Sequence, residues 1–359
     1  MVRELQTIKS QVRALRPYSL STHVASVKIN QNESPFELPP RIKEETFRRL
    51  EARQWSRYPD FIPTSLLERL SEFSGWPREG ILAGNGSNEL IQATLMVTVG
   101  DGKRVLISEP TFALYRQVST ILGGDVRSAS LSPALQYDPT QLADAVDKIQ
   151  PDVTIICSPN NPTGGVIEDD SLVDLLKRTS GLIVIDEAYH EFAGHSLVPL
   201  LREFRNLVVL RTFSKAMAMA GLRIGYLLAA PEVVSEIGKA VLPYNVNVFS
   251  QTAAEVAAEM YDEELRPQIG RIIAERKRLE RELELITGLT PVPSRANFML
   301  VRSQLSPKVV FEELLKRDIL IRDVSSYPML AEYFRVSVGT PEENNKLIGA
   351  LKEIVREAA

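Results

Sequence analysis

The chain has one cysteine, Cys157, among its 359 residues, so it cannot form an intrachain disulfide, and its composition gives no support for secretion. It contains no apolar run close to the roughly 20 residues that span a bilayer. The formal net charge is only -4, which indicates neither a nucleic-acid surface nor a membrane surface. We therefore expect a cytoplasmic protein that has no nucleic-acid or membrane partner.

Histidine is scarce as well, with three residues in the chain. His190 and His195 flank an acidic residue and look like part of a zinc motif, but they are five positions apart rather than the four that share a helical face. We therefore predict no metal site. Cys157 lies inside an apolar run and is best interpreted as a small buried hydrophobic residue.

The chain is long enough for two domains, and its 44% hydrophobic and 25% charged residues are typical of a globular protein. In residues 80–230 short apolar runs alternate with helical segments, which predicts an α/β fold with a mostly parallel sheet flanked by helices. The predicted strands are 104–108, 153–157, 182–186, 207–210 and 224–228, and the predicted helices include 88–97 and 172–178.

The pattern changes after residue 247, which predicts a smaller α+β domain. Its predicted elements are a long charged helical stretch at about 250–285, strands at 297–301 and 334–338, and a closing helix at 342–358. The predicted division is an N-terminal arm (1–40), a large cofactor-binding domain (41–247) and a small domain (248–359).

The N-terminal arm has apolar residues at helical spacing: Val2, Leu5, Ile8, Val12 and Leu15. This spacing predicts an amphipathic helix that packs on the body of the protein or on a second subunit. An organelle transit peptide is a weaker alternative, because Glu4 interrupts the segment and serine is sparse.

Lys215 is the most informative residue of the chain. It follows the apolar run 207–210 in what we predict to be a strand-to-helix turn, and Arg223 lies two predicted helical turns further on. A lysine amine in such a place suits a covalent bond to an aldehyde cofactor, pyridoxal phosphate, and it would move a proton when substrate frees it. The alternative is a solvated surface lysine.

Three polar residues at neighbouring strand ends fit the ring of the same cofactor. Asp186 closes an apolar strand, where it would either cap a helix or hold the ring nitrogen protonated. Tyr189 would donate a hydrogen bond to the ring oxygen, unless it is a core tyrosine. Asn161, in a loop with two prolines and two glycines, would bond to the same oxygen; a plain turn is the alternative.

The phosphate of the cofactor requires backbone N–H groups at a helix start, together with cations and hydroxyls. Ser87 and Asn88 follow Gly86 at the start of a predicted helix, and Thr212, Ser214 and Arg223 would close the pocket. A dinucleotide fingerprint is excluded, because Glu89 stands at its third glycine position. Phe112 would stack on the ring or belong to the core.

These residues carry a resemblance to the fold-type I pyridoxal-phosphate-dependent aminotransferases, and within them the chain is most similar to the histidinol-phosphate aminotransferases. The resemblance extends from residue 16 to 343. Its most specific parts are Asn160-Asn-Pro-Thr-Gly164, Asp186-Glu-Ala-Tyr189, Thr212-Phe-Ser-Lys-Ala216, Ala220-Gly-Leu-Arg223 and Pro293-Ser-Arg-Ala-Asn-Phe298.

The resemblance implies amino transfer between L-histidinol phosphate and 2-oxoglutarate in histidine biosynthesis. It implies that Lys215 bonds to the cofactor and that Tyr58 reaches the phosphate of the neighbouring subunit's cofactor in a homodimer. It assigns Arg335 to the substrate anion, with Arg322 as a second cation or a surface ion pair, and Tyr18 and Asn161 to the substrate side. Two features depart from the family pattern: Phe112 replaces the usual tyrosine, and the segment 30–36 lacks the usual asparagine before proline.

Other interpretations keep or discard the cofactor. An aromatic amino acid aminotransferase or a threonine-phosphate decarboxylase would use the same cofactor on another amine. A nicotinamide oxidoreductase is disfavoured by the failed glycine fingerprint, and it leaves Lys215 unexplained. A non-catalytic half of a transcription regulator is disfavoured because the sequence shows no appended DNA-binding segment.

Overall fold

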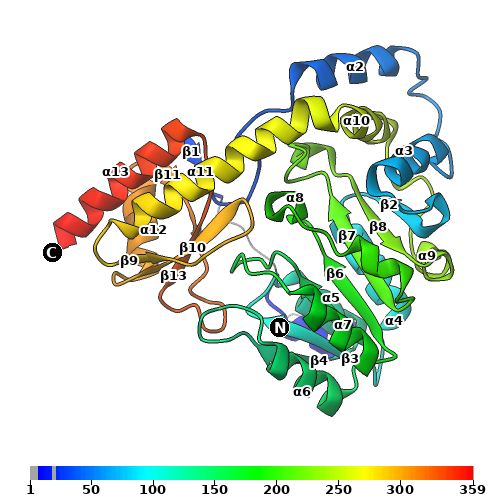
Figure 1. Cartoon of the computed structure of the whole chain (residues 1–359), viewed down its shortest axis with the longest axis horizontal. Coiled ribbons are helices and arrows are strands. Elements are labelled where there is room, and N and C mark those ends of the chain that lie inside the picture. The colour runs from blue at the N-terminus through cyan, green and yellow to red at the C-terminus, as the bar shows by residue number, and fades with distance from the viewer. Residues whose placement is uncertain (1–6, 18–21, 359) are drawn as a thin grey trace.

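A seven-stranded sheet forms the centre of the larger part of the molecule (Figure 1). The structure is a computed structural model and describes residues 7–17 and 22–358. Within these residues the strand order is β2-β8-β7-β6-β5-β3-β4, and β8 alone runs antiparallel to its neighbours. The strands are β2 (Ile81–Gly84), β3 (Arg104–Glu109), β4 (Asp125–Ser130), β5 (Val153–Cys157), β6 (Leu182–Asp186), β7 (Leu207–Thr212) and β8 (Gly225–Ala229).

Helices cover both faces of this sheet, so the predicted fold class is confirmed. Along β3, Leu106 faces the helices of one side and Ile107 those of the other, because successive strand residues alternate. One face packs on α3 (Thr64–Ser74), α6 (Pro139–Ile149), α7 (Asp169–Arg178) and α10 (Val248–Glu259). The other face packs on α4 (Ser87–Thr98), α5 (Leu114–Leu122) and α9 (Pro231–Gly238).

The edge strand β4 was not predicted from the sequence. Its residues are Asp125-Val-Arg-Ser-Ala-Ser130, and most of them are exposed. A polar edge strand gives no apolar run, because a sheet edge that faces water needs none. Further elements of this part are α2 (Pro40–Glu51), α8 (His190–Ala193), η1 (Arg78–Gly80) and η2 (Val198–Arg202).

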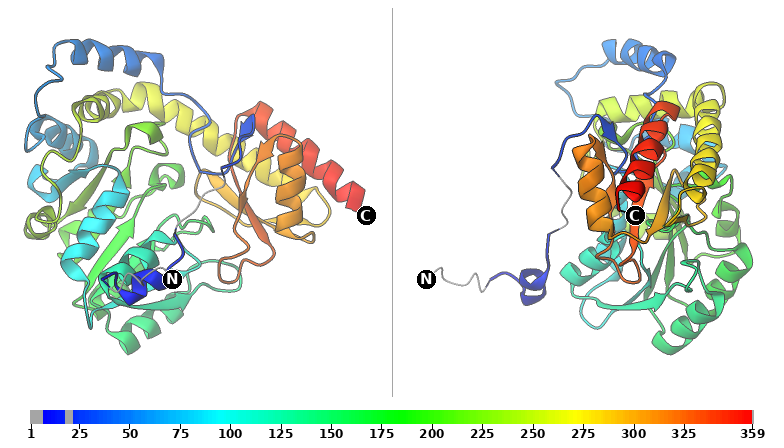
Figure 2. Two further views of the ribbon diagram at one scale, coloured as in Figure 1. Left: turned by 180° about the vertical axis from the view of Figure 1, so that it is seen from behind. Right: turned by 90° about the vertical axis from the view of Figure 1, so that its left-hand side faces the viewer.

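A four-stranded antiparallel sheet, in the order β12-β13-β10-β9, forms the small domain. Its strands are β9 (Leu289–Pro291), β10 (Phe298–Ser303), β12 (Arg322–Asp323) and β13 (Tyr333–Ser337), and its helices are α11 (Arg266–Glu284), α12 (Pro307–Lys316) and α13 (Pro341–Ala358). The arm joins this domain, because β1 (Val27–Lys28) pairs in parallel with β11 (Ile319–Leu320). Figure 2 shows the domain beside the large sheet, with α11 leading into it.

The stretch predicted as helical at about 250–285 is helical, but it would be wrong to treat it as one continuous α-helix. The chain instead forms α10, a π-helical turn at Tyr261–Leu265, and then α11. Pro267 explains the interruption, since proline has no N–H and its ring would clash with the carbonyl of Glu263 in a continuous α-helix. α10 remains in the core of the large sheet, where it contacts α2 and α3.

The helix predicted after Lys215 is also wrong. Residues 214–219 form turns, and a short 3-10 helix, η3 (Ala220–Leu222), leads back into β8. The chain has to reverse here because β8 is antiparallel to β7, and Arg223 adopts a left-handed φ of 53° at the reversal.

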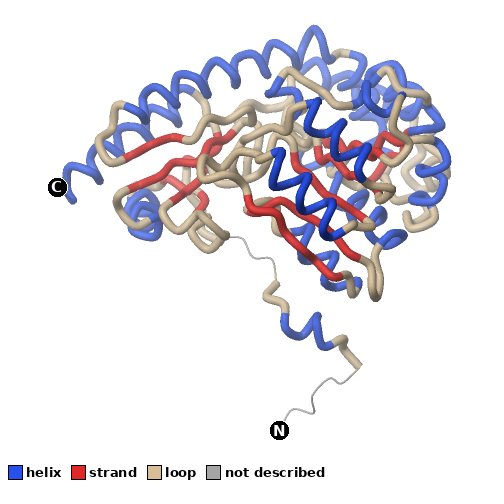
Figure 3. The backbone as a smooth tube through the Cα atoms, turned by 60° about the horizontal axis from the view of Figure 1, so that its bottom comes forward, coloured by secondary structure: helices blue, strands red, loops and turns tan. Residues whose placement is uncertain are grey.

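The N-terminal arm forms only a short helix in the described residues, α1 (Ser10–Ala14). It projects from the body (Figure 3) and has no buried residue. It contacts α5, where Lys9 Nζ donates to Ile121 O at 3.3 Å. Val2 and Leu5 of the predicted apolar face lie outside the described residues. None of the described helices is both long and apolar enough to cross a membrane.

Candidate active site

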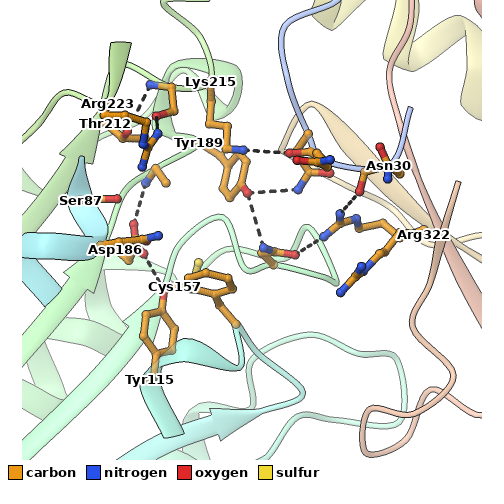
Figure 4. Close-up of a pocket in the computed structure, with 18 residues that line it drawn as sticks. Asn30, Ser87, Tyr115, Cys157, Asp186, Tyr189, Thr212, Lys215, Arg223 and Arg322 are labelled. Atoms are coloured by element: carbon orange, nitrogen blue, oxygen red, sulfur yellow. Dashed lines mark hydrogen bonds between the residues drawn. The ribbon is translucent and has the colours of Figure 1, made fainter. Parts of the chain in front are cut away.

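A cavity of about 350 Å³ lies between the large sheet and the small domain, at the edge where the parallel strands end (Figure 4). Loops that follow β3, β5, β6 and β7 bring their residues to this edge, as is usual for ligand sites on open α/β sheets. Twelve of the predicted site residues line it: Ser87, Asn88, Phe112, Asn161, Asp186, Tyr189, Thr212, Ser214, Lys215, Arg223, Arg322 and Arg335.

Lys215 reaches into the cavity from the turn after β7. Its Nζ donates to the backbone carbonyl of Gln31 at 2.9 Å. Burial is the main cause that lowers the pKa of this amine to about 8, and the positive charge of Arg335 lowers it further. A larger share of the amine is therefore neutral near pH 8 than in an ordinary lysine, as a nucleophile that attacks an aldehyde requires.

Asp186 ends β6 on the floor of the cavity. Its Oδ1 accepts from the backbone N–H of Ala188 at 3.1 Å, and its Oδ2 accepts from the hydroxyl of Tyr115 at 2.6 Å. Burial raises the pKa of this carboxyl, whereas the Tyr115 bond opposes the rise. A buried carboxylate held in this way would pair well with a protonated ring nitrogen.

Tyr189 and Asn161 lie together on one side of the cavity. Asn161 Nδ2 donates to Tyr189 Oη at 3.5 Å, while Asn161 Oδ1 accepts from Arg335 Nη1 at 2.6 Å. Burial raises the pKa of Tyr189, so its hydroxyl keeps its hydrogen at neutral pH. The phenol is thus available as a hydrogen-bond donor to a ring oxygen.

A cup for an anion forms where α4 begins opposite the turn after β7. Arg223 Nη1 donates to Ser214 Oγ at 3.0 Å, and Thr212 Oγ1 accepts from the N–H of Ser214 at 3.1 Å. Gly86 has a φ of 81°, and a Cβ placed there would lie 2.7 Å from Arg223 Nη2. Backbone N–H groups of the helix start, hydroxyls and a guanidinium fit a phosphate.

Arg322 and Arg335 occupy directly paired positions of β12 and β13 and face the cavity from the small domain. Arg335 is 7% exposed, and its Nη2 donates to the carbonyl of Asn30 at 2.7 Å. The positive charges at paired strand positions favour an anion between them. Figure 4 shows Arg322 across the cavity from Asp186.

One predicted site residue of the described chain, Tyr58, does not line this cavity. Tyr58 is 80% exposed and stacks on Tyr244, with 4.5 Å between the ring centroids. Tyr18 lies outside the described residues.

The two histidines of the apparent zinc motif have separate partners, because His195 Nε2 lies 2.7 Å from Asp169 Oδ1 and His190 Nδ1 lies 3.0 Å from the carbonyl of Glu187.

Cys157 is buried at the end of β5 next to the cavity, and burial raises the pKa of its thiol. It is a small buried residue, as predicted, rather than a reactive thiol.

Among the cavity-lining residues to which the sequence assigned no individual role, Tyr115 and Asn32 make the side-chain contacts that matter most. Tyr115 lies at the start of α5, three positions after Phe112, which precedes that helix; the two ring centroids are 5.5 Å apart in an edge arrangement. The three-position spacing of Phe112 and Tyr115 could have indicated that both rings lie near the site. Asn32 donates from Nδ2 to Tyr189 Oη at 3.1 Å over a separation of 157 residues, and no local pattern indicates such a contact.

Comparison with known proteins agrees with this geometry. Residues 25–351 match the model of the family described as aminotransferase class I and II. A curated relative, histidinol-phosphate aminotransferase 1 of Carboxydothermus hydrogenoformans, is 40% identical over 347 residues, which cover 97% of this chain and 98% of the relative.

Two solved structures of histidinol-phosphate aminotransferases share the fold. The enzyme from Clostridium acetobutylicum has a TM-score of 0.84 at 27% identity, with 92% of this chain and 99% of that chain covered. The enzyme from Sinorhizobium meliloti, in complex with pyridoxal-5'-phosphate, has a TM-score of 0.85 at 26% identity, with 94% and 93% covered.

The cavity passes a chemical test for pyridoxal phosphate, because it combines an amine of lowered pKa, a buried carboxylate, a phenol donor and an anion cup. The family match covers most of the sequence, and the curated relative matches it nearly end to end. The chain therefore belongs to the class I and II aminotransferases, and its cofactor is pyridoxal phosphate.

Proposed function

We propose that this enzyme transfers an amino group between L-histidinol phosphate and 2-oxoglutarate, as a step of histidine biosynthesis. One observation carries the choice of substrate: Arg322 and Arg335 are paired across β12 and β13 and line the same cavity as Lys215. Histidinol phosphate presents a phosphate and glutamate presents carboxylates, and a guanidinium binds either kind of oxygen in bidentate fashion. The 40% identical relative bears the corresponding name.

The charge of the cavity supports an anionic substrate in addition to an anionic cofactor. Its described lining has four cationic side chains and one carboxylate. The cations are Lys215, Arg223, Arg322 and Arg335, and the carboxylate is that of Asp186. Because we assign Arg223 to the phosphate cup, the two small-domain arginines are the cations that we propose for the substrate.

The cofactor, when bound, supplies an aldehyde that captures an amine and a ring that withdraws electrons from the adjacent carbon. In our proposal Lys215 Nζ is the group that moves a proton between the substrate carbon and the cofactor carbon. Asp186 would keep the ring nitrogen protonated, and Tyr189 and Asn161 would donate to the ring oxygen. Phe112 would pack against the ring, and Ser87, Asn88, Thr212 and Ser214 would hold the phosphate together with Arg223.

The test compares single-turnover half-reactions with histidinol phosphate, phenylalanine and threonine phosphate. Each reaction is monitored through the absorbance of the cofactor. We expect histidinol phosphate to react fastest and Arg335→Gln to remove most of that preference. If phenylalanine reacts as fast as histidinol phosphate, the proposed substrate is wrong. Release of carbon dioxide from threonine phosphate would instead identify a decarboxylase.

We also propose a homodimer in which Tyr58 completes the phosphate site of the partner. Tyr58, Phe61 and Tyr244 form an exposed aromatic cluster, at 80%, 66% and 41% exposure, which suits burial against a second copy. Mixing Lys215→Ala and Tyr58→Ala proteins tests this, because a mixed dimer would contain one intact site. A mixture that regains no activity under subunit exchange would contradict the proposal.

The limits of the domains and the cytoplasmic location stay predictions. The arm (1–40) contributes β1 to the small domain, which supports its assignment there. Because α10 packs in the core of the large sheet, we place the change to the small domain at the π-helical turn after it rather than at residue 248. Limited proteolysis of the apoenzyme would locate that boundary.

A further inference from the structure

Three consecutive residues of the N-terminal segment contact three functional groups of the site. The carbonyl of Asn30 accepts from Arg335 Nη2 at 2.7 Å, and that of Gln31 accepts from Lys215 Nζ at 2.9 Å. Asn32 differs from both, because it uses its side chain: its Nδ2 donates to Tyr189 Oη at 3.1 Å. A substitution at Asn32 therefore removes its contact with Tyr189. Substitutions at Asn30 or Gln31 would leave their own contacts in place, because those use the backbone carbonyl.

The orientation of the Asn32 amide follows from its other bonds. The backbone N–H of Asn32 donates to Ser337 Oγ at 2.8 Å. Ser337 Oγ then donates its own hydrogen to Asn32 Oδ1 at 3.1 Å. The amide oxygen is thereby fixed toward Ser337, and the NH₂ group must face Tyr189.

The backbone of Asn32 is held in a conformation that few residues adopt. Its φ is 56°, in the left-handed region, where asparagine and glycine are the residues best tolerated. Asn297 Nδ2 donates to the carbonyl of Asn32 at 3.1 Å, and Asn32 is only 1% exposed. The backbone conformation and the surrounding packing therefore hold the NH₂ group of Asn32 against the hydroxyl of Tyr189.

The Asn32 contact determines where the hydrogen of Tyr189 can go. Tyr189 Oη accepts from Asn32 Nδ2 at 3.1 Å and from Asn161 Nδ2 at 3.5 Å. With two donors on its oxygen, the phenol has only its single hydrogen left to give. We propose that Asn32 is a positioning residue that directs the hydroxyl hydrogen of Tyr189 into the cavity, to the ring oxygen of the cofactor.

This inference rests on the proposed role of Tyr189, and it predicts a spectroscopic effect. A hydrogen bond donated to the ring oxygen lowers the affinity of that oxygen and its neighbouring nitrogen for a shared proton. Loss of the Asn32 donor weakens that bond. The midpoint pH at which the visible absorbance of the loaded enzyme titrates should therefore rise, by about 0.5 to 1 pH unit for one ordinary hydrogen bond.

Asn32→Gly is the appropriate variant, because glycine accepts the left-handed φ without strain and removes only the side chain. Asn32→Asp keeps the shape but replaces the donor with an acceptor, which would take the hydrogen of Tyr189 for itself. We expect the midpoint to rise in both variants, and further in Asn32→Asp, where a negative charge is added. Cofactor loading and the melting temperature are measured on the same samples.

The control is the same substitution in a Tyr189→Phe background, where Asn32 has no hydroxyl to direct. We expect Asn32→Gly to shift the midpoint in the native background and to add no shift to Tyr189→Phe. An equal shift in both backgrounds, or no shift in a fully loaded Asn32→Gly enzyme, would overturn the proposal. A purely structural role would change loading and melting temperature without moving the midpoint. The titration contains no amine substrate. Its result therefore does not depend on whether histidinol phosphate proves to be the substrate.

Discussion

Replacing Tyr115 with phenylalanine tests how the buried carboxylate of Asp186 is kept ionised. The substitution keeps the ring, including its edge contact with Phe112, and removes only the hydroxyl that donates to Asp186 Oδ2 at 2.6 Å. Tyr115 is 0% exposed and Asp186 is 4% exposed, so water does not replace the lost donor without rearrangement. The carboxylate keeps one bond, from the N–H of Ala188.

The size of the effect follows from the charge of the acceptor. A hydrogen bond to a charged group contributes about 1.5–3 kcal/mol, and about 1.4 kcal/mol corresponds to one pKa unit. Burial already raises the pKa of Asp186, and the Tyr115 bond opposes that rise. Its loss favours the neutral acid, so the pKa should rise by a further ~1–2 units.

The assay is the pH dependence of the half-reaction, measured by stopped-flow absorbance on fully loaded enzyme. The acid limb of the profile should shift to higher pH in Tyr115→Phe, because Asp186 becomes protonated at a higher pH and the ring nitrogen then loses its ionised partner. Tyr137→Phe is the matched control, since the hydroxyl of Tyr137 donates to the carbonyl of Cys157 at 2.5 Å and not to Asp186. Coincident profiles for Tyr115→Phe and the native enzyme, or an equal shift in Tyr137→Phe, would refute the reasoning.

Three further outcomes are expected. Gly86→Ala should weaken pyridoxal phosphate binding at least tenfold in equilibrium titration, because its Cβ would lie 2.7 Å from Arg223 Nη2. Gly75→Ala is the control, since Gly75 has a φ of 69° and a Cβ there would meet nothing within 4 Å. This control should lower the melting temperature but leave the affinity for pyridoxal phosphate unchanged. The rate of cofactor capture by the apoenzyme should rise with pH and level off above a midpoint near 8, because burial disfavours the charged form of Lys215; a midpoint near the ordinary 10.5 would contradict this cause. Arg335→Lys should slow the histidinol phosphate half-reaction about 10-fold or more, since an ammonium cannot reproduce a bidentate contact, and an unchanged rate would exclude Arg335 from substrate binding.

The pattern of residues along the chain was enough to predict the α/β class, the strands that carry the site and most of the residues at their ends. Strands such as Val153–Cys157 are buried on both faces, so their apolar character is continuous and visible in the chain. Asp186 closes one such strand and Lys215 follows another closely, and parallel strands end at one edge of the sheet. The proximity of these two residues therefore follows from local pattern and strand direction.

Features that depend on distant partners arise only from the packing of the whole chain. Pro267 divides the helical stretch expected at 250–285, and the antiparallel β8 replaces the helix expected after Lys215 with a reversal of the chain. The contact between Asn32 and Tyr189 spans 157 residues, and the pairing of Arg322 with Arg335 is a matter of strand register. Local patterns report the burial of each segment but not the neighbour against which it is buried, because that choice is made only when all the segments pack together.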